Sequence, residues 1–201
     1  MRTVTGLFDD YRDARDAVRD LEAAGVPSDD ISVVANNTGD WYSAESSNTA
    51  EGAGTGAGLG AAGGGVVGLL TGLGLMAIPG VGPVVAAGWL ASTAVGAAAG
   101  AAAGGAAGGL IGALTDSGID EGEAHVYAEG VRRGGTLVTA RVDESLAPQA
   151  EVILEQRNNV DPAARRSIYA DEGWTRFDEK ADPYTLDQVQ RERERYRTMM
   201  P

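Results

Sequence analysis

The chain has 201 residues, of which 29 are acidic and 16 are Lys or Arg, so its formal net charge is −13. An acidic chain without a basic stripe repels nucleic acid phosphates, and we expect no nucleic-acid partner. The absence of cysteine excludes disulfide bonds and thiolate metal sites.

The first 36 residues predict a β-α-β unit. Residues 3–8 have the composition of a short strand, and Asp9 or Asp10 is placed to cap a helix. The helix is expected to end at Gly25, and a second strand follows over residues 31–35. The apolar side chains of the expected helix recur at helical spacing: Ala14, Ala17, Val18, Leu21 and Ala24. Residues 37–50 are polar and predict a linker.

The stretch from Gly52 to Thr115 contains no charged residue and consists mainly of Gly, Ala, Val and Leu. Small residues recur every fourth position, a spacing that lets helix backbones approach closely. We therefore predict a glycine-zipper hairpin of two long α-helices over residues 51–116. The turn is assigned to Pro79, Gly80, Gly82 and Pro83, and the packing positions to Gly52, Gly56, Gly60, Gly64, Gly68, Gly72, Gly88, Ser92, Gly96, Gly100, Gly104, Gly108 and Gly112.

The second half of the chain repeats the strand and helix pattern. It predicts a helix over residues 120–133, a strand over 136–142, a helix capped by Ser145 and a short strand near Val160. Without the hairpin, the order is β-α-β followed by β-α-β. The expected fold class is therefore α+β, with a ferredoxin-like antiparallel sheet and helices on one face.

This predicted domain comprises residues 1–36 and 117–160, and the glycine-rich hairpin interrupts it. A polar C-terminal tail, residues 161–201, follows the domain and ends in a short helix at about residues 185–199. Thr185 and Gln188 form a capping box for that helix. The aromatic residues of the tail predict that it docks on the rest of the protein.

Two groups of short motifs resemble the bacterial general stress protein domain of the YflT or "17M-like" kind. The first is Val4-Thr5-Gly6-Leu7-Phe8, the helix with Ala14, Ala17, Val18 and Leu21, and the run from Gly25 to Val34. The second is Gly118-Ile119, then Glu123, Ala124, Tyr127 and Val131-Arg132, and Gly134 to Val138. The resemblance covers roughly residues 3–160. It implies a small, stress-induced bacterial protein and supplies no catalytic residue to carry over.

The sequence offers no convincing catalytic, cofactor or metal site. His125 is the lone histidine, and it has neither partner ligands for zinc nor an identifiable nucleophile. The glycines from Gly58 to Gly63 match a dinucleotide pattern, but no strand precedes them. Asp9-Asp10 and Asp29-Asp30 stand where helix caps and turns favour Asp. We expect a non-enzymatic protein without a cofactor.

Three interpretations of the uncharged segment remain open: a membrane anchor, a soluble assembly element and a flexible linker. Each arm exceeds the roughly 20 residues that span a bilayer, but no Lys or Arg flanks the arms. The strict glycine period and the defined turn argue against a linker. We therefore predict a homo-oligomer, membrane association or both, with the protein in the cytoplasm or attached to the inner membrane. The alternative is a small-molecule or signal-binding module on the ferredoxin-like sheet.

Overall fold

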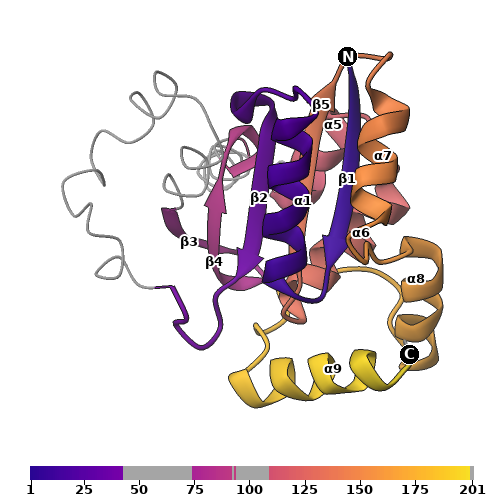
Figure 1. The fold of residues 1–201 in the computed structure, drawn as a ribbon. Coiled ribbons are helices and arrows are strands. Elements are labelled where there is room, and N and C mark those ends of the chain that lie inside the picture. Colours follow the sequence, from indigo (N-terminus) through magenta and orange to yellow (C-terminus); the bar gives the residue numbers. More distant parts are fainter. Residues whose placement is uncertain (43–73, 92, 94–108, 200–201) are drawn as a thin grey trace.

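The computed structural model of the chain describes residues 1–42, 74–91, 93 and 109–199 (Figure 1). The first β-α-β unit forms as the sequence predicted. Its elements are β1 (Arg2–Phe8), α1 (Tyr11–Ala23), a 3-10 turn (Ser28–Asp30) and β2 (Ile31–Asn36). Asp10 caps α1 by accepting a hydrogen bond from the Arg12 amide. The helix ends because Gly25 takes a positive φ of 97°.

The second half supplies α6 (Glu121–Arg132), β5 (Thr136–Val142) and α7 (Ala147–Glu155). β5 lies between β1 and β2 and runs antiparallel to both, so β1 and β2 are parallel to each other. The α+β class with an antiparallel sheet is confirmed. This three-strand core has the order of a ferredoxin-like sheet that lacks its last strand.

The predicted strand near Val160 is wrong, because a single backbone hydrogen bond joins the segment around Val160 to β1 within the described residues. The Val160 amide donates to the Leu7 carbonyl at 2.8 Å, and the Asn159 side chain accepts from the Leu7 amide at 2.9 Å. The chain then turns away, because Asp161 caps a new helix, α8 (Pro162–Asp171), that begins at a proline. Proline cannot donate to a strand ladder but suits the first helical position.

The predicted helical hairpin is wrong around its assigned turn. Residues 74–87 form a β-hairpin of β3 (Gly74–Ile78) and β4 (Gly82–Ala87). β4 pairs with β2, so the sheet has the order β1-β5-β2-β4-β3. The glycine period fits a helix, but the valines at the centre of β4 favour a strand. Pairing of β4 with the edge of β2 stabilises the strand conformation. Helix follows β4 at residues 89–91 and 93 and again at α5 (Leu110–Asp116), whereas residues 51–73, 92 and 94–108 lie outside the described part of the chain.

The sheet is covered on both faces rather than on one (Figure 1). α1 and α7 pack on one face around Phe8, Val18 and Leu154, whereas α5 and α6 pack on the other around Leu7, Leu114 and Val131. The prediction of helices on one face was wrong because α5 and α6 belong to the long central connection and cross the opposite face. All six residues of β2 are consequently buried.

The C-terminal tail ends in α9 (Leu186–Met199), which confirms the short terminal helix. The Thr185 amide donates to the Gln188 side chain at 2.8 Å, as expected for a capping box. α9 crosses the end of the sheet where β1 and β2 finish, and α8 lies beside α6 (Figure 1). Tyr169, Phe177 and Tyr196 of the tail are buried.

Candidate functional site

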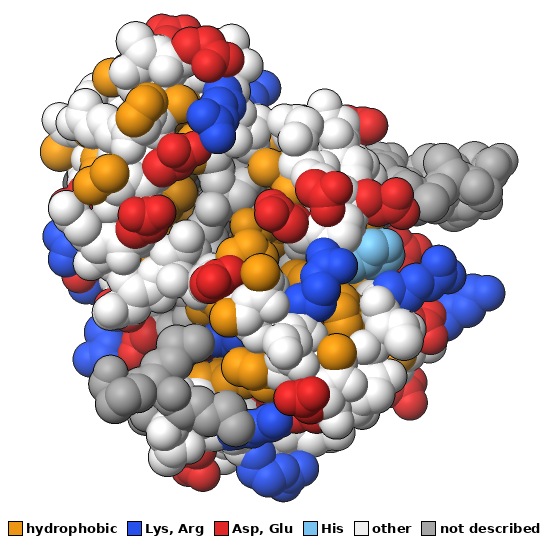
Figure 2. Space-filling model, turned by 90° about the vertical axis from the view of Figure 1, so that its right-hand side faces the viewer, with side chains coloured by type: hydrophobic (Ala, Val, Ile, Leu, Met, Phe, Trp, Pro, Cys, Tyr) orange, Lys and Arg blue, Asp and Glu red, His pale blue; other side chains and the backbone are white. Residues whose placement is uncertain are grey.

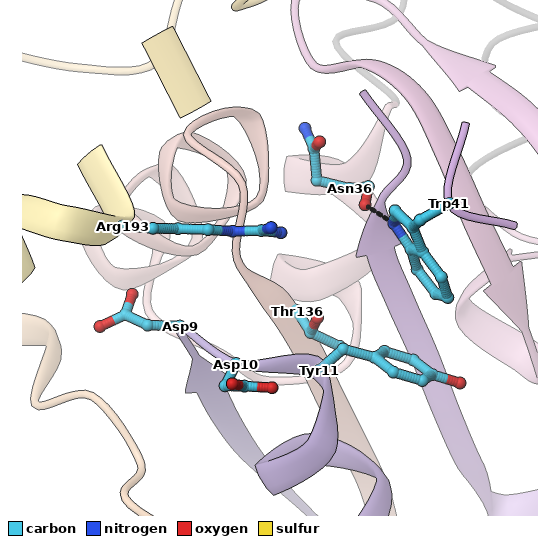
Figure 3. A pocket seen from close by; sticks show the side chains of 7 residues that line it. All are labelled: Asp9, Asp10, Tyr11, Asn36, Trp41, Thr136 and Arg193. Atoms are coloured by element: carbon cyan, nitrogen blue, oxygen red, sulfur yellow. Dashed lines mark hydrogen bonds between the residues drawn. The ribbon is translucent and has the colours of Figure 1, made fainter. Parts of the chain in front are cut away.

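A pocket of about 200 Å³ lies at the end of the sheet where β1 and β2 finish and β5 begins (Figure 3). These three ends meet because β1 and β2 both run antiparallel to the strand between them. The lining comes from the loops after β1 and β2, from the strand ends and from α9: Asp9, Asp10, Tyr11, Asn36, Trp41, Thr136 and Arg193.

The two aspartates of the pocket have structural partners. Asp10 caps α1, and both carboxylate oxygens of Asp9 accept hydrogen bonds from the Arg165 guanidinium, at 2.9 and 2.6 Å. Such a bidentate pair fixes the position of a carboxylate as well as stabilising it. Asp10 therefore serves as the helix cap that the sequence favoured, whereas Asp9 serves a long-range ion pair.

The opposite wall is aromatic. The rings of Tyr11 and Trp41 lie 4.7 Å apart, and the Trp41 indole donates to the Asn36 carbonyl at 2.8 Å. Burial is the main cause of a raised pKa at Tyr11. The Asn36 side chain in turn donates to the Val131 carbonyl at 3.0 Å, which satisfies the end of α6. Trp41 remains 43% exposed, so its ring can contact a ligand.

Arg193 brings a positive charge to the pocket from α9. Its guanidinium donates to the Gly134 carbonyl at 2.7 Å, and Figure 3 shows the side chain extending from α9 over the pocket. The tail therefore completes this site. A pocket that combines an arginine, a threonine hydroxyl and an aromatic ring can recognise a small polar ligand.

A network of charges around the buried Arg133 and Glu129 holds the tail in place. Arg133 donates to Glu129 at 2.7 Å and to Glu172 at 2.5 Å, and its guanidinium lies 4.2 Å from the centre of the Tyr169 ring. Burial opposes the charge of Arg133, but the hydrogen bond to Glu129, the Glu129 charge and the neighbouring tyrosines together outweigh it, so the pKa is raised. Glu172 also pairs with Arg195 of α9. α6, α8 and α9 are thus joined by one set of charges.

Arg165 forms a second anchor of the tail. It is 1% exposed, pairs with Asp9 and lies 3.7 Å from the centre of the Tyr196 ring. Burial opposes its charge as well, but the hydrogen bond to Asp9, the Asp9 charge and the neighbouring Tyr169 and Tyr196 together leave its pKa raised. Sequence reasoning missed Arg133 and Arg165 as anchors. Nothing in the local pattern distinguishes them from the neighbouring Arg132 and Arg166.

The glycine positions assigned to helix packing fall into two groups. The structure describes Gly88, whose backbone approaches Ile31 and Ser32 of β2 at a φ of 86°, and Gly112, which lies in α5. The other packing positions lie outside the described residues: Gly52, Gly56, Gly60, Gly64, Gly68, Gly72, Ser92, Gly96, Gly100, Gly104 and Gly108.

The predicted turn residues do form a turn, although between strands. The Val81 amide donates to the Ile78 carbonyl at 3.0 Å, with Pro79 and Gly80 between them. Gly80 has a φ of 73°, the conformation that favours glycine after proline in a tight turn. Gly82 and Pro83 begin β4.

The described residues show no constellation typical of catalysis or metal binding. His125 lies in α6, 18% exposed, with Glu121 at 3.9 Å as its charged neighbour. Among the ranges that the structure describes, no group of three or more His, Cys, Asp or Glu side chains could hold a metal ion.

Residues 3–80 match the family model described as the heat induced stress protein YflT domain. Neither a search of curated proteins nor a search of solved structures found a match. The family match confirms the resemblance drawn from the first β-α-β unit, and it reaches Gly80 in the turn after β3. The motifs between residues 118 and 138 lie beyond the matched range, so their resemblance stays a prediction.

Proposed function

We propose, from the premise that residues 3–80 form a heat induced stress protein YflT domain, that this stress-response protein acts by non-catalytic self-association. The uncharged segment from Gly52 to Thr115 mediates the assembly, with its glycine ladders as the packing surface. The protein works in the cytoplasm, and the homo-oligomer is its functional form.

The observation that carries this proposal is the character of β3. It is an edge strand of the described sheet, it contains no charged residue, and Leu75 on it is 49% exposed. Natural edge strands are usually protected by charge, proline or a bulge, because an open edge pairs with other chains. β3 also connects directly to the glycine ladder that precedes it. An unprotected edge and a packing ladder at one place favour association of copies.

Self-association is favoured over membrane insertion because four strongly apolar residues after Gly80 have partners within the fold. Val81, Val84, Val85 and Leu90 are fully buried in the protein core. These four side chains are therefore not available to a lipid bilayer. No helix in the described ranges combines the length and apolar character needed to cross a membrane. Membrane attachment of the segment is the competing form of this proposal.

Sedimentation velocity of the full chain in detergent-free buffer tests the assembly. We expect particles several times larger than the monomer. Gly64→Leu and Gly100→Leu should disperse them by preventing close packing, and Leu75→Lys should weaken them by charging the edge. Val152→Lys is a matched control, because Val152 is 48% exposed on α7 at the other side of the fold. A monomer, or equal effects of both lysine variants, would contradict the proposal.

Flotation with liposomes distinguishes the membrane form. Recovery of the wild-type chain with liposomes, and of a soluble monomer without them, would replace self-association by membrane attachment.

A second candidate function is the recognition of a small polar molecule in the pocket beside α9. Arg193, Thr136 and Trp41 are the observation that favours it. A thermal-shift screen with nucleotides and small anions tests it: a ligand should raise the Tm of the wild type and not that of Arg193→Gln. If no compound raises the Tm, this candidate is refuted.

A further inference from the structure

The outer edge of β1 is open where a ferredoxin-like sheet would carry its fourth strand. In an antiparallel ladder, successive residues present their N–H and C=O groups to alternate sides. The Leu7 groups point away from β5, because they bond to Asn159 and Val160. Thr5 and Thr3 share that direction, since they are two and four residues away. After Val160 the chain departs into α8, so it forms no ladder beside Thr5 and Thr3.

A groove of about 460 Å³ runs along this open edge. Its floor is residues 1–5, and its walls are the turn before α6, the first turn of α6, and α7 with the loop before it. Figure 2 looks onto this side of the molecule and shows a hollow between two lobes with acidic side chains around it. The groove is lined by Met1, Arg2, Thr3, Val4, Thr5, Ser117, Gly118, Ile119, Asp120, Glu123, Tyr127, Glu144 and Glu151.

The groove is negatively charged. It contains four carboxylates, and its single guanidinium, Arg2, is already paired with Glu151 at 2.7 Å. Burial, and then the charge of Glu123, raise the pKa of the Tyr127 hydroxyl. Within the described part of the chain, the buried Thr5 hydroxyl has no hydrogen-bond partner. The groove therefore has an excess of negative charge and a buried hydroxyl without a partner.

We propose that this groove binds an extended basic peptide of a partner protein, which adds as a strand to the edge of β1. Its backbone pairs with Thr5 and Thr3, and its Lys or Arg side chains reach the acidic walls. Side chains of a strand alternate between faces, so the α7 wall with Glu144 and Glu151 and the α6 wall with Asp120 and Glu123 can both be contacted. Five residues of β1 span roughly 16 Å, which suits a peptide of about five residues.

The charge argues for a partner protein over a second copy of this chain. The uncharged β3 edge would bring no positive group to the four carboxylates. α9 carries several arginines, but it is a helix docked at the end of the sheet. The proposal is independent of the self-association proposed above.

Fluorescence anisotropy with a labelled peptide of alternating Lys and Val tests the proposal. We expect saturable binding to the full chain that weakens at high salt, and no binding of the analogue with Glu in place of Lys. The double variant Glu123→Gln/Glu144→Gln should raise the Kd at least fivefold. The matched control Glu155→Gln/Asp171→Asn changes the net charge equally at exposed positions outside the groove, and should leave the Kd unchanged. Equal Kd values for both double variants would overturn the proposal.

Amide hydrogen exchange then locates the peptide. The Thr3 and Thr5 amides should become protected when the peptide is added, whereas those of Arg2 and Val4, which face β5, should not change. Protection of Thr3 and Thr5 that increases with protein concentration in the absence of peptide would overturn the proposal in favour of a second copy. Displacement of the peptide by millimolar Ca²⁺ with no protection of these amides would overturn it in favour of a cation site.

Discussion

Replacing Arg165 by methionine should loosen the C-terminal tail from the sheet. The arginine is 1% exposed and joins three parts of the fold: α8, which carries it, Asp9 after β1, and the Tyr196 ring on α9. Methionine retains much of the apolar stem but removes the guanidinium. The substitution therefore tests the charge and the hydrogen bonds more than the packing.

The expected loss follows from the two interactions. Removing one partner of a buried ion pair costs about 3–5 kcal/mol when the other charge stays buried. Asp9 is 30% exposed, so water can reach its carboxylate, and we reduce this to about 2 kcal/mol. The contact of the guanidinium with the Tyr196 ring adds about 1 kcal/mol. The free energy of unfolding should thus fall by about 3 kcal/mol, well above the effect of a surface substitution.

Urea unfolding followed by far-UV circular dichroism measures this change. Arg166→Met is the matched control, because Arg166 is the next residue of α8 and is exposed; it should change stability by less than about 0.5 kcal/mol. A double-mutant cycle with Asp9→Asn should give a coupling energy of about 2 kcal/mol. If Arg165→Met costs no more than its neighbour, or if the cycle shows no coupling, the anchoring role of the pair is refuted.

Three further predictions concern single side chains. Gly88→Ala should lower the free energy of unfolding by about 1–3 kcal/mol more than Gly118→Ala. Both glycines have a positive φ, but only at Gly88 would a Cβ atom clash with β2. Urea unfolding compares the two variants, and equal losses of stability would refute the clash. Burial raises the pKa of Tyr169 to about 12, so the unfolded chain ionises first and the free energy of unfolding should fall by about 2 kcal/mol between pH 10 and 12. Alkaline urea titrations should show this loss diminished in Tyr169→Phe, and an unchanged loss would contradict the prediction. Asn159→Ala leaves the Leu7 amide without its acceptor and should cost about 1–2 kcal/mol, whereas unchanged stability and unchanged exchange of that amide would show that water replaces the side chain.

The tail and the pocket are linked through α9. Arg193 lines the pocket, and the same helix carries Glu192, which bonds to Arg133 at 3.3 Å and accepts from the Tyr196 hydroxyl at 2.5 Å. Any substitution that releases α9, such as Arg165→Met, should therefore also remove Arg193 from the pocket. A ligand found by thermal shift should lose affinity in that variant.

Local signals in the sequence determined the β-α-β unit, the cap at Asp10, the terminal helix and the α+β class. Each depends on residues close in the chain: a capping side chain lies two or three residues from the amide that it binds, and apolar spacing defines the buried face of a helix. The same signals predicted that Pro79 and Gly80 form a turn.

Only the tertiary structure decided the rest. Glycine, alanine and valine between residues 74 and 87 fit either conformation, and pairing with β2 makes them strands. The fourth strand is lost because Asp161 and Pro162 start a helix instead, which leaves the edge of β1 open. Asp9 and Arg165 are 156 residues apart, and no local pattern indicates that the fold brings them to 2.6 Å. Long-range pairing of strands and charges depends on the whole chain, and short-range periodicity does not encode it.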